Sequence, residues 1–156
     1  MKHRSISYYK KREKYLSNKI SDGEKYLDIN NFLLELGWLY DQWSLLESKT
    51  IKKILQIKAK KYFRKVLKKE PQNLSALNGL GTVYLHENKY LNSLKYYKKL
   101  HSIHQSSMSH NALGNVYRQL GKSEFAIDNY KKAMQLADNP VDKKAAIYNL
   151  NQVKVI

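Results

Sequence analysis

The sequence of 156 residues has no cysteine, only two prolines and six glycines, and few acidic residues. Without cysteine the chain cannot form disulfides, thiolate metal sites, cysteine nucleophiles or iron–sulfur clusters. So few prolines and glycines leave little room for the many turns of an all-β protein. No apolar run approaches the roughly 20 residues of a membrane-spanning helix, and no apolar stretch follows the basic N-terminus as in a secretory signal. We therefore expect a soluble protein of the cytoplasm or of an organelle stroma.

Positive charge dominates what is present. Lysine and arginine total 29 against 13 acidic residues, which gives a formal net charge of +16. Hydrophobic residues make up 42% and charged residues 27% of the chain, a balance typical of a globular protein that buries a core. The composition predicts a folded, basic, helical protein, in which the lysine excess can reflect genomic codon bias as well as an acidic partner.

One pattern recurs three times. It reads Leu-x2-Leu-Gly-x2-Tyr at Leu33–Tyr40 and Leu77–Tyr84, and has histidine in the first position at His110–Tyr117. At helical spacing its Leu, Gly and Tyr lie on one face, and the glycine lets a partner helix approach closely. A small residue and an aromatic follow at fixed spacing in each copy: Ala59 and Phe63, Ser93 and Tyr97, and Ala126 and Tyr130.

This pattern resembles the tetratricopeptide repeat, a helix–turn–helix unit of about 34 residues. The resemblance implies an all-α, right-handed solenoid of three repeats, at residues 30–73, 74–106 and 107–140. A basic helical extension is expected at residues 1–29 and a C-terminal capping helix at residues 141–156. We expect Asn88 and Gly121 in the turns within repeats, and Pro71 and Pro140 to end second helices.

The first repeat departs from the pattern, because ten extra residues separate its Tyr40 from Ala59. Apolar residues recur at helical spacing there, so we expect longer helices, with Thr50 as the N-cap of the second. The N-terminal stripe of Tyr9, Leu16 and Ile20 is expected to fold back over this extension. The alternative is an exposed apolar patch whose anchors, Trp43 and Leu46, join two copies of the chain.

At the other end of the chain, the capping helix is expected to cover the last repeat. Its apolar stripe is predicted to consist of Val141, Ala145, Tyr148 and Val153.

The resemblance also implies a concave groove lined by the first helix of each repeat. We expect Trp38, Asn78, Asn111, Asn115 and Arg118 to bind a peptide there, because asparagine both donates to and accepts from an extended backbone. Two alternatives stay open: asparagine is simply abundant, and Trp38 packs against the N-terminal segment. The wider lining is predicted to comprise Leu34, Asp41, Gln42, Thr82, Leu85, His86, Gln119 and Asn149.

A second candidate surface is basic. Residues 49–69 contain ten lysines and arginines and no acidic residue. Such a face could bind phosphate backbones, anionic lipid headgroups or an acidic protein, or it could be an ordinary solvated surface. The cations expected opposite the buried face include Lys53, Lys60, Lys61, Arg64 and Lys68.

Signals for enzyme activity are weak. The sequence has no P-loop, no GxGxxG and no nucleophile paired with a base at interpretable spacing. His101, His104 and His110 could ligate zinc in principle, but no cysteine or carboxylate accompanies them. We expect no catalytic residue, metal or cofactor.

The expected function is therefore a non-catalytic adaptor or assembly factor that holds a segment of a partner protein in its groove. The alternative is an electrostatic binder of RNA or of an anionic membrane surface through residues 49–69. Homo-oligomerisation is a third possibility, and the partner itself is not indicated.

Overall fold

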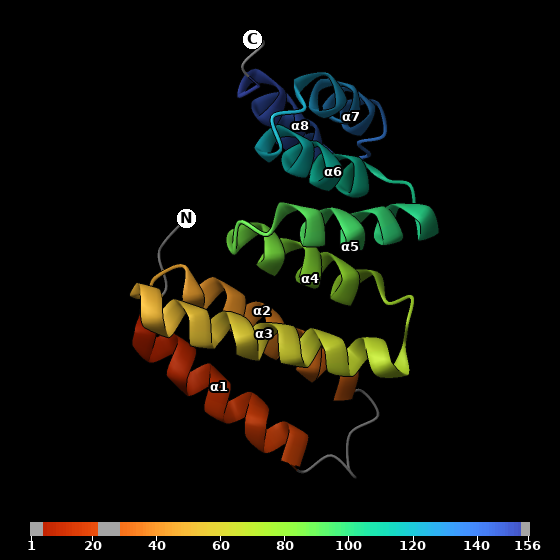
Figure 1. Ribbon diagram of the computed structural model, residues 1–156. Coiled ribbons are helices and arrows are strands. Elements are labelled where there is room, and N and C mark those ends of the chain that lie inside the picture. The colour runs from red at the N-terminus through yellow and green to blue at the C-terminus, as the bar shows by residue number, and fades with distance from the viewer. Residues whose placement is uncertain (1–4, 22–28, 154–156) are drawn as a thin grey trace. The chain divides into compact units, whose positions relative to one another are not determined.

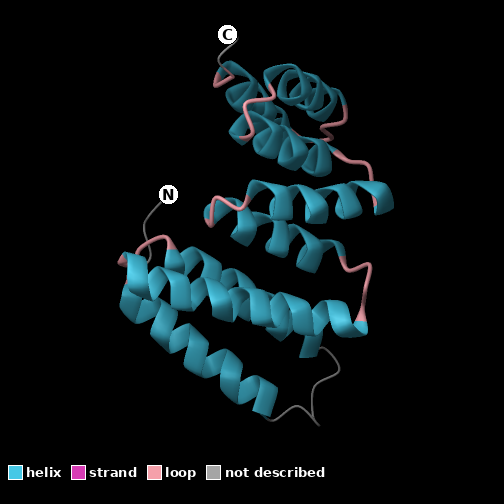
Figure 2. Cartoon of the chain, viewed as in Figure 1, coloured by secondary structure: helices cyan, strands magenta, loops and turns pink. Residues whose placement is uncertain are grey.

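The chain forms helices and no strands in residues 5–21 and 29–153, which are the residues that the computed structural model describes (Figure 2). Contacts divide the chain into two compact units, Met1–Val83 and Tyr84–Ile156. The boundary falls inside one helix. The helices are α1 (Ile6–Ser21), α2 (Ile29–Ser44), α3 (Lys49–Lys69), α4 (Leu74–His86), α5 (Tyr90–Ile103), α6 (Ser107–Gln119), α7 (Ser123–Gln135) and α8 (Pro140–Asn151) (Figure 1).

The first unit is built on a long helical hairpin. Its helices α2 and α3 have 16 and 21 residues, whereas α4 to α7 have 13 or 14 each. The extra residues of the first repeat are therefore helical, as expected. The N-cap of α3 is Ser48 and not Thr50. The prediction of Thr50 is wrong because α3 begins at Lys49, two residues before Ile51, the first apolar residue of the helix.

The ring of Phe63 on α3 explains the glycines of this unit. A Cβ on Gly37 of α2 would lie 2.6 Å from a carbon of this ring, and a Cβ on Gly79 of α4 would lie 2.4 Å from one. Real Cβ atoms do not approach carbon atoms so closely, so only glycine lets α2 and α4 lie against the ring. Phe63 itself is fully buried. The repeat glycine and the aromatic of the following helix thus form one packing unit.

Helix α1 folds back on the hairpin, as the N-terminal stripe predicted. Tyr9 and Leu16 are buried, and the Tyr9 ring stacks on the Trp43 indole with centroids 6.1 Å apart. Arg12 also pairs with Glu35 on α2. Trp43 is therefore buried, and the prediction that it is an exposed anchor for a second copy is wrong, because an aromatic from α1 covers it. Leu46 is exposed.

The second unit repeats one turn twice. Asn88 and Gly121 both adopt positive φ, at 58° and 72°, and both follow the end of a first helix. In each turn the next residue closes the same hydrogen bond: Lys89 N donates to Tyr84 O and Lys122 N donates to Tyr117 O, each at 2.9 Å. The predicted turn positions are thus confirmed, and asparagine, which tolerates this backbone, takes the place of glycine in the first turn.

The C-terminal helix α8 packs on α6 and α7 with a different face from the predicted one. Ala146 is buried, whereas Val141, Ala145 and Tyr148 are exposed. The predicted stripe is therefore wrong, because Asn149 turns inward and donates to Asn111 on α6. Pro140 does not end α7 but begins α8, after the N-cap Asn139. Residues 154–156 of the expected capping helix lie outside the described residues.

Candidate functional site

The second unit carries a row of polar side chains on α6. Asn111, Asn115 and Arg118 are spaced by four and three residues, so they share one helix face, and all three are half-buried. Neighbouring helices hold both amides. The Asn149 amide of α8 donates to Asn111 Oδ1 at 3.0 Å, and the Tyr130 hydroxyl of α7 donates to Asn115 Oδ1 at 2.8 Å.

These two hydrogen bonds decide what the row offers to a ligand. Both use the amide oxygen as the acceptor, so the amide nitrogens of Asn111 and Asn115 are left as donors. Arg118 adds a guanidinium, whose Nε is buried without a hydrogen-bond partner among the described residues. Burial raises the pKa of the Tyr130 phenol, and Arg118 lowers it in part, so Tyr130 stays a donor at neutral pH. We call Asn111, Asn115 and Arg118 the α6 polar row.

The two predicted groove residues of the first unit differ from this row. The Trp38 indole packs edge-on against Phe63, with centroids 5.2 Å apart, and its Nε1 donates to Ser75 Oγ at 3.4 Å. It therefore contacts α3 and α4. Asn78 on α4 is half-buried. Asp41, expected to line the groove, is buried, and that part of the prediction is wrong.

The basic face of α3 is exposed at four of the five predicted positions, Lys53, Lys61, Arg64 and Lys68. Lys60 is only 7% exposed, so its prediction as a surface cation is wrong. Gln56, one helical turn earlier, is buried with it. The buried arc of α3 is wider than the apolar residues indicate, because the helix packs against both α2 and α4 through Phe63.

Comparison with known proteins gives a family match for part of the chain. Residues 72–139 match the model of the tetratricopeptide repeat family. These residues carry tetratricopeptide repeats. The match covers α4 to α7 with the adjoining residues, and so includes Asn78 and the α6 polar row. Comparison with curated proteins gives no match.

Solved structures show the same tetratricopeptide solenoid fold at low sequence identity. A thermophilic TPR protein of Thermus thermophilus is 16% identical with a TM-score of 0.76, over 87% of this chain and 70% of that one. BtubC of P. vanneervenii is 17% identical with a TM-score of 0.74, over 93% and 65%. A MamA double mutant of strain RS-1 is 17% identical with a TM-score of 0.59, over 93% and 92%. The chain thus spans about two thirds of the length of the first two.

Tetratricopeptide repeats are in general non-catalytic scaffolds for protein–protein interaction. Residues 5–21 and 29–153 contain no group of three or more histidine, aspartate or glutamate side chains that could hold a metal ion. The described helices include none with the length and hydrophobicity needed to cross a membrane.

Two of the three histidines considered above as zinc ligands, His101 and His110, contact each other. The rings of His101 on α5 and His110 on α6 lie edge to face with centroids 4.5 Å apart. Each Nδ1 already has a partner: Ser109 Oγ at 3.0 Å for His101 and Asn129 Oδ1 at 3.1 Å for His110. Burial, and then His110 and Lys132, lower the pKa of His101. The pair is part of the packing between two repeats.

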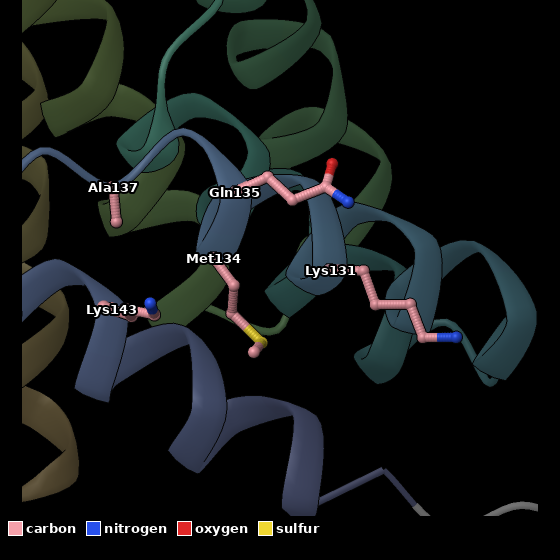
Figure 3. A pocket seen from close by; sticks show the side chains of 5 residues that line it. All are labelled: Lys131, Met134, Gln135, Ala137 and Lys143. Carbon is pink, nitrogen blue, oxygen red and sulfur yellow. The ribbon is translucent and has the colours of Figure 1, made fainter.

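A shallow hollow between α7 and α8 was not indicated by the sequence. Lys131, Met134 and Gln135 line it from α7, with Ala137 from the loop and Lys143 from α8. Figure 3 shows the Met134 side chain pointing towards α8 while the Lys131 side chain extends away from Lys143. The two ammonium groups therefore do not converge in this hollow.

Sequence reasoning found the α6 polar row from the family resemblance but missed how it is held. Neither the Tyr130 hydroxyl bond nor the Asn149 amide bond follows from helical periodicity, since both join residues on different helices. The signal that could have indicated the first is the choice of tyrosine over phenylalanine at position 130, where position 63 of the first repeat has phenylalanine.

Proposed function

We propose that this tetratricopeptide repeat protein is an adaptor or assembly factor that holds a segment of a partner protein through the inner side chains of its repeats. The residues proposed to bind are Asn78 and Trp38 in the first unit, and the α6 polar row in the second. No catalysis is involved. The partner segment is extended or helical and presents hydrogen-bond acceptors.

The observation that carries this proposal is the orientation of the two α6 amides. Because Tyr130 and Asn149 take up the oxygens, Asn115 and Asn111 offer N–H groups. Arg118 beside them adds charged donors, and hydrogen bonds to ionised groups are stronger than neutral ones. A row of donors fits the carbonyl oxygens of a peptide backbone, or a carboxylate, and does not depend on a specific side chain.

The two first-unit residues have unequal parts in the proposal. Trp38 is tied to Phe63 and Ser75, so it offers a fixed apolar edge and not a ring that is free to stack. Asn78 occupies the position of its helix that Asn111 occupies in α6, three residues before the repeat glycine. We therefore assign hydrogen bonding to Asn78 and shape to Trp38.

A pull-down from the native lysate tests the proposal. The tagged protein is treated with nuclease and washed at about 50 and then about 200 mM salt, a range in which contacts to several phosphates weaken by orders of magnitude. We expect one defined protein to survive both treatments with the wild type. The variant Asn78→Ala with Asn111→Ala should retain much less of it at unchanged helicity. Equal retention by that variant would refute the groove, and loss of all material with nuclease would indicate RNA instead.

A further inference from the structure

The solvent-exposed face of α3, which we call its outer face, carries exposed aliphatic side chains as well as cations. Ile51, Ile54 and Ile57 are 43%, 52% and 55% exposed. They are spaced by three residues, so each is a neighbour of the next on the helix surface. Leu45 and Leu46, in the turn that leads into α3, are exposed as well. Single exposed aliphatic residues are ordinary, but a contiguous row of them marks a contact surface.

The second half of the same face is cationic. Lys61 follows Ile57 by four residues, and Arg64, Lys65 and Lys68 continue along the helix, all of them exposed. No acidic residue lies in α3. At a rise of about 1.5 Å per residue, its 21 residues extend over about 30 Å. In Figure 1 this helix passes in front of α2 as one continuous rod. The face is therefore long and straight. Its first half has the three isoleucines, with exposed Lys53 and Lys58 among them, and its second half has cations alone as exposed side chains.

Three occupants can be compared by their chemistry. A nucleic acid would pair with the lysines but place its charged backbone against the isoleucines, and it is bound more often through stacked aromatic side chains. A second copy of this face would bring lysines against lysines. An anionic bilayer satisfies both halves, because its headgroups attract lysine while the boundary of its acyl chains takes up aliphatic side chains.

From this complementarity we infer that α3 docks its outer face on an anionic lipid surface. The helix lies in the plane of the interface, with Ile51, Ile54 and Ile57 inserted and with Lys61, Lys65 and Lys68 at the headgroups. The surface shares no residue with the α6 polar row. This function goes beyond the proposed adaptor role.

Vesicle sedimentation tests the inference with the full chain. The vesicles are phosphatidylcholine with about 30% phosphatidylserine, and phosphatidylcholine alone serves as the neutral reference. We expect binding to the anionic vesicles only. The triple variant Ile51→Ser, Ile54→Ser and Ile57→Ser keeps the net charge and should bind about 10-fold or more weakly, because the inserted aliphatic surface is lost. The matched control exchanges two exposed aliphatic residues of the second unit, Leu91→Ser and Val141→Ser, and should bind like the wild type.

Insertion is measured separately with a single label, which the absence of cysteine makes simple. Ile54→Cys and, as control, Leu91→Cys each carry an environment-sensitive fluorophore. We expect the emission at position 54 to shift to the blue on anionic vesicles and that at position 91 to stay unchanged. The inference is overturned if the triple serine variant binds as tightly as the wild type, or if position 54 shows no shift. Failure to bind anionic vesicles, with retention of RNA or of an acidic protein, would overturn it as well.

Discussion

The two units solve the same packing problem with different chemistry. In each, a buried aromatic ring lies against the repeat glycine of the preceding helix: Phe63 against Gly37 and Tyr130 against Gly114. The residue after each glycine then contacts that ring. In the first unit it is Trp38, whose indole meets Phe63 edge-on, and in the second it is Asn115, which accepts a hydrogen bond from the Tyr130 hydroxyl.

This difference explains where binding chemistry can lie. The pair of Phe63 and Trp38 has no hydrogen-bonding group directed at the other member, so the first unit has an apolar inner contact. In the pair of Tyr130 and Asn115, the hydroxyl holds the amide oxygen and leaves the amide N–H groups as donors. Tyr130 of the second unit has a hydroxyl that Phe63 of the first unit lacks, and this hydroxyl accompanies the change from an apolar contact to a row of hydrogen-bond donors. The first unit carries its charge on the outer face of α3 instead.

The largest effect on stability is expected at Trp43, which is covered by α1, the additional helix of the first unit. Trp43 is buried under Tyr9 of α1, so Trp43→Ala should lower the free energy of unfolding by about 3–5 kcal/mol. Hydrogen exchange should show the loss in α1, α2 and α3 and spare α6 to α8. Sedimentation of the variant at the same time checks oligomerisation. A variant with unchanged stability but altered sedimentation would show that Trp43 is an interface residue after all.

A smaller effect on stability is expected at the repeat glycine, which each unit packs against an aromatic ring. A Cβ on Gly114 would lie 2.6 Å from a Tyr130 ring carbon. Gly114→Ala should destabilise the second unit by about 1–3 kcal/mol, since the ring must shift in a packed core. Denaturant unfolding measures it, and Gly37→Ala is the matched change in the first unit. If alanine stabilised either unit through its better helix propensity, the close approach of the helices would be refuted.

The hydroxyl that distinguishes the units should contribute less. Tyr130→Phe removes the hydrogen bond to Asn115 and keeps the ring, so we expect a loss of about 1 kcal/mol. Tyr148→Phe, at an exposed position of α8, should cost nothing measurable. Tyr130→Phe also frees the Asn115 amide to turn, so the affinity of the Tyr130→Phe protein for the partner should fall. An unchanged affinity would show that the Tyr130 hydroxyl has no role in binding the partner.

The smallest effect is a dependence of stability on pH in the second unit. The pKa of His101 is lowered from 6.5 by burial, then by His110 and Lys132. The unfolded chain therefore takes up a proton at a higher pH than the folded chain does. This contribution to stability is complete above the unfolded pKa and is lost as the pH falls below it. His101→Gln should flatten the decline in stability on acidification. Equal slopes in the wild type and His101→Gln would contradict this.

Much of the fold follows from short-range patterns in the sequence. The spacing of glycine and aromatic residues predicts which rings meet which helices, and Phe63 and Tyr130 confirm it. Asn88 and Gly121 mark turns because few other residues adopt positive φ. These features depend on neighbours within one hairpin, and periodicity reports such neighbours well.

The features that escaped prediction depend on contacts between hairpins. Helix α8 could bury either of two stripes, and the more apolar one was the natural choice. The bond from Asn149 to Asn111 goes with the other stripe. A helical wheel places Lys60 opposite the apolar residues of α3, but α3 is buried over a wider arc. The direction of the α6 amides, on which the proposed binding depends, has no trace in the sequence pattern.

The most direct test of the account is the affinity of the captured partner for Asn111→Asp. Aspartate keeps an oxygen that can accept from Asn149, so the fold is preserved, but it replaces the outward N–H donor with an acceptor of negative charge. The matched control is Asn92→Asp, at an exposed position of α5. We expect about a 10-fold or greater loss of affinity for Asn111→Asp and none for the control. Equal affinities of the two variants would contradict a donor surface on α6.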